Sequence, residues 1–164
     1  MSAHKNIHIG MLGCGVVGSQ VARLLQSDQE ELSKRSGAEL VLKKVGVRTT
    51  AAREGIPTHL LTTDLMSVVN DPEINIVIEV LGGIEPAREL ILAAIANKKS
   101  VITANKALLA THGHELFNAA DAAGVDLYYE AAVAGAIPII RSMRESLAGD
   151  QITRVMGIVN GTTN

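Results

Sequence analysis

A glycine-rich turn near the N-terminus has the residue types and spacing of a phosphate-binding site. The sequence GCGVVG at residues 13–18 follows an apolar run, residues 7–12, and leads directly into an amphipathic segment. Gly13 permits a tight turn, Gly15 lets the backbone approach a pyrophosphate, and Gly18 lets a helix pack closely on a strand. The positive N-terminal end of that helix then faces the anion. We therefore expect a dinucleotide to bind at this turn.

The end of the second expected strand has an arginine where NAD-binding proteins usually have an acid. An Asp or Glu there accepts hydrogen bonds from the adenosine ribose, but this strand ends in VRTT at residues 47–50. The guanidinium of Arg48 is a permanently charged fork suited to a ribose 2′-phosphate, and Arg53 lies close in sequence. We therefore predict NADP as the preferred cofactor, with NAD as the alternative. Arg48 would otherwise be an ordinary arginine at the start of a surface loop.

Strand-like and helix-like segments alternate along the rest of the chain. Such an alternation, with connections long enough for right-handed crossovers, predicts an α/β fold with a doubly wound parallel sheet. The expected strands are residues 7–12, 40–47, 74–81, 101–103, 125–129 and 152–159. The expected helices are the segment after the glycine turn and residues 64–69, 87–96, 111–123 and 136–148.

Composition excludes several classes of function. The 164 residues have 15 Lys and Arg against 17 Asp and Glu, a net charge of −2, and no basic run that would bind nucleic acid. No apolar segment reaches the ~18 residues of a membrane span, and the N-terminus does not resemble a signal peptide. Cys14 is the single cysteine, so no internal disulfide forms. We expect a cytoplasmic protein that binds neither nucleic acid nor membrane.

Four further segments carry a resemblance to a known family. They are IEVLGG at residues 78–83, VITANK at 101–106, YEAAVAGAIPI at 129–139 and MGIVNGTTN at 156–164. With the glycine turn, they resemble the cofactor-binding, Rossmann-type domain of homoserine dehydrogenase, of the type without a fused aspartate kinase. The resemblance implies hydride exchange between NAD(P)H and aspartate semialdehyde, which gives L-homoserine on the route to threonine, methionine and isoleucine.

The resemblance also implies roles for individual residues. The pyrophosphate would be held by residues of the glycine turn: Gly13, Gly15, Val16, Val17 and Gly18. Arg48 would contact the adenosine end, and Gly82 and Gly83 would let the nicotinamide half lie against the backbone. Lys106 would lie beside the nicotinamide and the substrate, where its ammonium can polarise a carbonyl or anchor a carboxylate. The alternative for Lys106 is a solvent-exposed lysine at a helix start.

The segment after residue 129 resembles the monovalent-cation loop of the family. A sodium ion there would be bound mostly by backbone carbonyl oxygens, from Glu130, Val133, Gly135 and Ile137. Carbonyl oxygens are suitable ligands for a hard cation. A plain strand-to-helix turn is the alternative interpretation.

The resemblance predicts that residues 1–150 form an NADP-binding domain and that residues 151–164 begin a substrate and dimerisation region. In the family that region supplies a carboxylate for the homoserine amine and a second lysine as proton donor. We therefore expect these 164 residues to be inactive alone, and the full-length enzyme to be a homo-oligomer. One alternative is a non-catalytic NADP-sensing module, which would have no use for Lys106. Another is a different small amino-acid dehydrogenase, such as one acting on aspartate, although residues 157–164 favour homoserine dehydrogenase.

Overall fold

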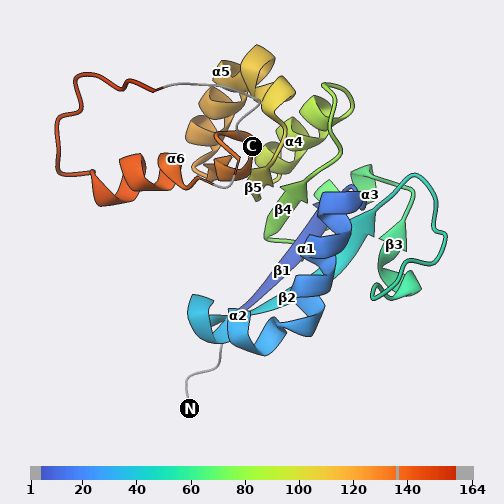
Figure 1. Ribbon diagram of the computed structural model, residues 1–164. Coiled ribbons are helices and arrows are strands. Elements are labelled where there is room, and N and C mark those ends of the chain that lie inside the picture. The colour runs from blue at the N-terminus through green and yellow to red at the C-terminus, as the bar shows by residue number, and fades with distance from the viewer. Residues whose placement is uncertain (1–4, 136, 158–164) are drawn as a thin grey trace.

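The computed structural model describes residues 5–135 and 137–157 and contains a six-stranded sheet in which every strand pairing is parallel (Figure 1). The strands run in the spatial order β3-β2-β1-β4-β5-β6, the order of a doubly wound dinucleotide-binding fold. The predicted fold class is therefore confirmed. The strands are β1 (Lys5–Leu12), β2 (Ala38–Gly46), β3 (Leu61–Thr62), β4 (Ile76–Glu79), β5 (Ser100–Thr103) and β6 (Leu127–Tyr128).

Helices connect the strands and cover the sheet. They are α1 (Val16–Ser27), α2 (Gln29–Ser36), α3 (Met66–Val69), α4 (Ala87–Ala96), α5 (Lys106–Ala123) and α6 (Ile139–Arg141). A π-helical turn (Ser142–Ser146) continues α6, and 3₁₀ turns occupy Thr58–Leu60 and Glu130–Ala132. In the described residues, no helix is both long and apolar enough to span a membrane.

Two hydrophobic cores lie on opposite faces of the sheet. On one face, Ala22 and Leu25 of α1 pack with Met11 of β1. On the other face, side chains from α3, α4 and α5 pack with Leu12 and with residues of β4 and β5. Met11 and Leu12 are neighbours on β1, and both are fully buried. The central strand β1 thus contributes side chains to both cores, as expected for a strand with helices on either side.

Several element boundaries differ from those expected. The helix over residues 87–96 is confirmed, whereas the helix expected at 111–123 begins five residues earlier, at Lys106. Asn105 explains the earlier start, because its side chain accepts a hydrogen bond from Leu108 N and caps the helix. Helix α2 and strand β3 were not predicted. None of the residues of α2 is buried, so it lacks the apolar periodicity that would reveal a helix.

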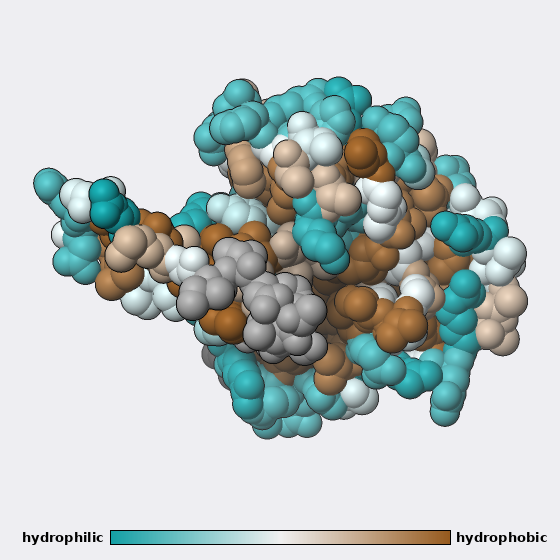
Figure 2. Space-filling view, turned by 45° about the horizontal axis from the view of Figure 1, so that its top comes forward, coloured by the Kyte–Doolittle hydropathy of each residue, from teal (hydrophilic) through white to brown (hydrophobic). Residues whose placement is uncertain are grey.

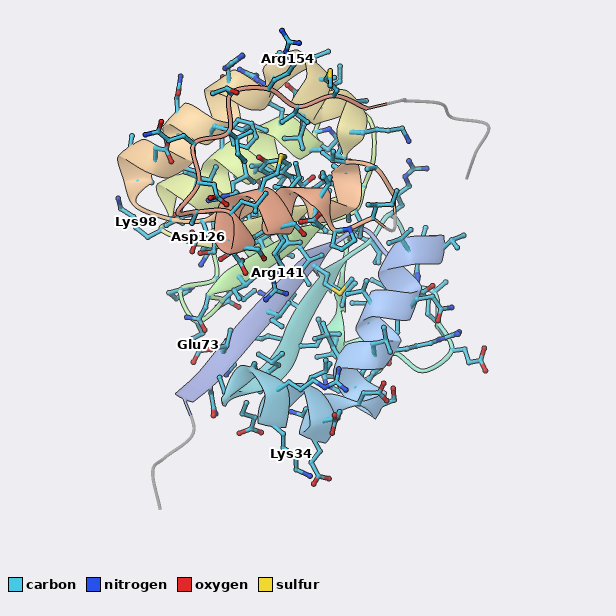
Figure 3. The ribbon with its side chains drawn as sticks, turned by 60° about the vertical axis from the view of Figure 1, so that its left-hand side comes forward. Lys34, Glu73, Lys98, Asp126, Arg141 and Arg154 are labelled. Atoms are coloured by element: carbon cyan, nitrogen blue, oxygen red, sulfur yellow. The ribbon has the colours of Figure 1, made fainter. Side chains whose placement is uncertain are left out.

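The strand expected over residues 152–159 is wrong for its described part. Residues 151–157 form no strand, and Ile152, Val155 and Met156 are exposed. A strand needs a neighbour with which to exchange backbone hydrogen bonds, and no described strand lies beside this segment. It runs along the periphery of the molecule after α6 (Figures 1 and 3), and Figure 3 labels Arg154 on it. Of the helix expected over 136–148, residues 139–146 are helical, and Ala136 lies outside the described residues.

Candidate cofactor-binding site

A cavity of about 580 Å³ lies at the carboxyl ends of the strands. Its lining comes from the segments that follow four strands: Gly13, Cys14 and Gly15 after β1; Val47, Arg48 and Arg53 after β2; Thr63 and Leu65 after β3; and Val80, Leu81, Gly82, Glu85 and Pro86 after β4. The chain leaves β1 toward β2 on one side and returns as β4 on the other. Ligands of doubly wound sheets bind at such a switch point. Figure 2 shows one face of the molecule, with hydrophobic residues gathered at its centre and hydrophilic residues around them.

The three glycines of the turn are required for different reasons. Gly13 has a φ of +101°, and a Cβ there would lie 2.7 Å from the carbonyl oxygen of Val80. A Cβ on Gly18 would lie 2.5 Å from the carbonyl oxygen of Gly13, so helix and turn could not pack as they do. At Gly15 a Cβ would meet no protein atom within 4 Å. Gly15 therefore leaves open space on the cavity wall, which fits a ligand that approaches the backbone there.

The N-terminus of α1 offers hydrogen-bond donors beside this space. Gly15 is the N-cap residue and has no side chain to accept from the first turn. The first N–H groups of a helix have no partner within it, and the exposed fractions of Val16 and Val17 are 86% and 57%. The helix end thus presents backbone donors and the positive end of its dipole to an anion. A pyrophosphate fits this arrangement.

Two arginines line the same cavity at its β2 side. Arg48 is exposed and makes no ion pair within the described part of the chain. Arg53 donates from Nη1 to the carbonyl oxygens of Thr49 and Ala51, at 3.0 and 2.8 Å, and so fastens the loop that follows Arg48. Glu54, the neighbouring acid, is paired with Arg23 at 3.1 Å. This side of the cavity therefore carries positive charge suited to a phosphate.

The loop after β4 forms the opposite wall. Gly82 and Gly83 have φ values of +74° and +75°, a conformation that other residues rarely adopt. Leu81 N and Gly82 N donate to the carboxylate of Glu79, at 2.8 and 3.3 Å. Gly82 lines the cavity, whereas the cavity lining does not include Gly83. Glu79 was not among the residues expected to form the site, although an acid inside an otherwise apolar strand is a signal of a specific role.

Lys106 is the first residue of α5, and its side chain is exposed. It does not line the 580 Å³ cavity. Its neighbour Asn105 is buried and donates from Nδ2 to the carbonyl oxygen of Gly83 at 2.6 Å. The start of α5 is therefore fastened to the Gly82–Gly83 loop. The role of Lys106 beside the nicotinamide and substrate stays a prediction.

The loop expected to bind sodium makes several internal hydrogen bonds. The carboxylate of Glu130 accepts from Ile140 N and Arg141 N, at 3.0 and 2.7 Å, and so caps α6. The carbonyl oxygen of Glu130 accepts from Val133 N, and that of Ile137 accepts from Ile139 N. A carbonyl oxygen has a second lone pair, so the carbonyl oxygens of Glu130 and Ile137 fit a hard cation chemically. The sodium site, with its remaining residues Val133 and Gly135, stays a prediction.

Comparison with known protein families identifies the chain. A family model described as the NAD binding domain of homoserine dehydrogenase matches residues 13–130, which include the glycine turn, both arginines and the β4 loop. The chain belongs to the homoserine dehydrogenase family. A second model, described as homoserine dehydrogenase, matches residues 138–164.

Individual homoserine dehydrogenases are similar over nearly the whole chain. The enzyme of Mycobacterium tuberculosis H37Rv is 53% identical over 160 residues, which are 98% of this chain and 36% of that enzyme. The enzyme of Bacillus subtilis 168 is 44% identical over 162 residues, 98% of this chain and 37% of that enzyme. A crystal structure of a homoserine dehydrogenase from Thiobacillus denitrificans superposes with a TM-score of 0.82 at 49% identity, over 89% of this chain and 34% of that one. The chain thus spans little more than a third of these relatives.

Proposed function

We propose that these residues bind NADP(H) for a homoserine dehydrogenase that interconverts aspartate semialdehyde and L-homoserine. The observation that supports this most directly is the open space at Gly15, on a cavity wall next to the N-terminus of α1. The two arginines on the β2 side favour NADP over NAD, because a 2′-phosphate would meet their charge.

The cofactor would lie across the switch point between β1 and β4. Its pyrophosphate would accept hydrogen bonds from the first turn of α1, and Arg48 would bind the adenosine 2′-phosphate. The nicotinamide half would lie against the Gly82–Gly83 loop. When bound, the nicotinamide cofactor donates or accepts the hydride.

Lys106 would act on the substrate rather than on the pyrophosphate. Its ammonium, at the exposed start of α5, would anchor the substrate carboxylate or polarise the aldehyde carbonyl. We also propose the division into an NADP-binding domain over residues 1–150 and a substrate and dimerisation region that begins at residue 151. In that arrangement the whole protein is a homo-oligomer, and the loop from Glu130 to Ile137 binds sodium.

Replacement of Gly15 by valine tests the proposed cofactor site. Because a Cβ at Gly15 meets no protein atom within 4 Å, Gly15→Val should fold normally. The valine would fill the space of the pyrophosphate and should abolish binding of NADPH, measured by titration of NADPH fluorescence or by calorimetry. The matched control is Gly149→Val, which also meets no neighbour within 4 Å but lies after α6, away from the cavity. Normal NADPH affinity in Gly15→Val would show that the cofactor binds elsewhere.

A further inference from the structure

The carboxylate of Glu79 is fully buried at the carboxyl end of β4. One oxygen accepts from Leu81 N at 2.8 Å and from Gly82 N at 3.3 Å, and the other accepts from Thr103 Oγ1 at 2.6 Å. No lysine, arginine or histidine among the described residues pairs with it. A buried polar group is costly without hydrogen-bond partners, and these three donors satisfy the carboxyl group of Glu79 and fix its position.

Thr103 and Asn105 extend these contacts into a closed network. Thr103 lies directly opposite Glu79 in the β4–β5 register, and its hydroxyl accepts from Asn105 N at 3.1 Å while it donates to Glu79. Asn105 then donates from Nδ2 to the carbonyl oxygen of Gly83 at 2.6 Å, and its Oδ1 accepts from Leu108 N at 3.2 Å. The network therefore joins the β4 loop, β5 and the start of α5.

The network fixes the shape of the wall that faces the cavity. The N–H groups of Leu81 and Gly82 are directed to Glu79, and the carbonyl oxygen of Gly83 accepts from Asn105. These polar groups are therefore occupied inside the protein. The two glycines are held with consecutive positive φ values, and the helix that begins with Lys106 is held against them.

We propose that Glu79, Thr103 and Asn105 position the nicotinamide half of the cofactor. They do so by holding the Gly82–Gly83 loop, through which Gly82 lines the cavity, and the start of α5 at a fixed separation. The inference rests on the proposed function, since it takes this wall as the nicotinamide side of the cavity. Glu79 is a positioning residue, because it contacts the loop and not the cofactor.

The substitution Glu79→Gln tests the proposal with two ligands. An amide at residue 79 can still accept from Leu81 N and Gly82 N through its oxygen, but its NH₂ group then faces the Thr103 hydroxyl, whose proton loses its carboxylate acceptor. We expect NADPH affinity to fall about tenfold. Affinity for adenosine 2′,5′-bisphosphate, which has the adenosine end but no nicotinamide, should stay unchanged. Calorimetric titration of both ligands measures this split.

Variants of Thr103 test the proposal where Glu79→Gln does not fold. Thr103→Val removes the hydroxyl and should weaken NADPH binding as Glu79→Gln does. Thr103→Ser keeps the hydroxyl and should bind NADPH with the affinity of the unmodified chain. The matched control is Thr111→Val in α5, because the Thr111 hydroxyl bonds only to carbonyl oxygens of its own helix, those of Ala107 and Leu108. Its NADPH affinity should equal that of the unmodified chain.

The outcomes separate the inference from the proposed function. If the unmodified chain binds neither ligand, the proposed function is wrong. If it binds both, and Glu79→Gln and Thr103→Val bind NADPH normally, only the positioning role is wrong. Equal losses for NADPH and the bisphosphate would also overturn it, because they would indicate general damage to the fold.

Discussion

Arg48 is the residue on which the preference for NADP rests. It is exposed on the cavity wall and its guanidinium is not engaged in an ion pair in the described structure. Arg48→Ala should therefore weaken NADPH binding by about 1.5–3 kcal/mol, the worth of a charge-assisted hydrogen bond, and leave NADH binding nearly unchanged. Calorimetric titration of both nucleotides checks the prediction. Arg35→Ala is the control, since Arg35 is a surface arginine paired with Glu31 on α2. Equal losses for NADPH and NADH would show that Arg48 does not read the 2′-phosphate.

At the residue scale, local geometry was predictable and long-range contacts were not. The roles of Gly13 and Gly18 in the turn follow from their spacing, and steric contacts in the structure agree with them. The contact of Asn105 with Gly83 joins residues 22 positions apart, and that of Thr103 with Glu79 joins residues 24 apart. Such pairs become visible only once strands β4 and β5 are known to be neighbours.

Lysines of β2 and of the turn just before β5 hold the loop between α3 and β4 in place. Lys44 Nζ lies 3.1 Å and Lys43 Nζ 3.4 Å from the carboxylate of Asp71, and Lys99 Nζ donates to the carbonyl oxygens of Asp71 and Ile74 at 2.6 and 2.8 Å. Burial raises the pKa of Asp71, but the hydrogen bond and charge of Lys44 and the charge of Lys43 outweigh it, so this pKa lies below its ordinary value of 3.8. Burial also lowers the pKa of Lys99.

Asp71→Asn should therefore lower the free energy of unfolding by about 1–2 kcal/mol at neutral pH. Since the folded-state pKa of Asp71 is below the unfolded value of 3.8, the carboxylate stabilises the protein fully above that value. The difference between the two proteins should shrink as the pH falls through the lower, folded-state pKa. Urea unfolding followed by circular dichroism at a series of pH values measures this.

The control is Asp126→Asn, because Asp126 lies on the exposed loop before β6 (Figure 3) and makes no ion pair in the described residues. Figure 3 also labels Glu73, which lies on the same loop as Asp71 and pairs with Lys43 of β2. A difference between Asp71→Asn and the unmodified chain that persists unchanged at the lowest pH would mean that charge is not what stabilises the loop.

At the element scale, periodicity predicted the central strands and α4, and end signals were less informative. Helix α5 begins at Lys106 because of a side-chain cap, and α2 has no buried residue. Two ion pairs on α2, Glu30 with Lys34 and Glu31 with Arg35, each join residues that are one helical turn apart. The apolar residues after 151 resemble a strand in sequence, but no strand among the described residues lies beside them. A local sequence pattern does not show whether a neighbouring strand is present.

For the whole molecule, we predict binding of NADPH without turnover of homoserine by these 164 residues. Hydride transfer requires the substrate to be held in a reactive orientation, which can lower the activation free energy by ~7–11 kcal/mol. It also requires a positioned proton donor or acceptor, which raises the rate by a further ~10²–10⁴-fold. The described cavity carries the proposed phosphate site and the proposed nicotinamide wall, and the chain spans 36% of the length of the Mycobacterium tuberculosis enzyme. The assay is NADP reduction at saturating homoserine, with NADPH binding measured on the same preparation. Robust turnover that Lys106→Ala abolishes would contradict the prediction.

The central position of β1 has a consequence for the order of folding. β1 pairs with β2 at a separation of 33 residues, from Lys5 to Ala38, and with β4 at 67 residues, from Ile9 to Ile76. During synthesis the β1–β2 half can therefore form while β4 has yet to emerge, and one edge of β1 and its apolar Leu12 side then stay open to other chains. Contacts of such long range also slow folding. The cavity, whose lining runs from Gly13 to Pro86, therefore cannot form until β4 and the loop after it have been synthesised.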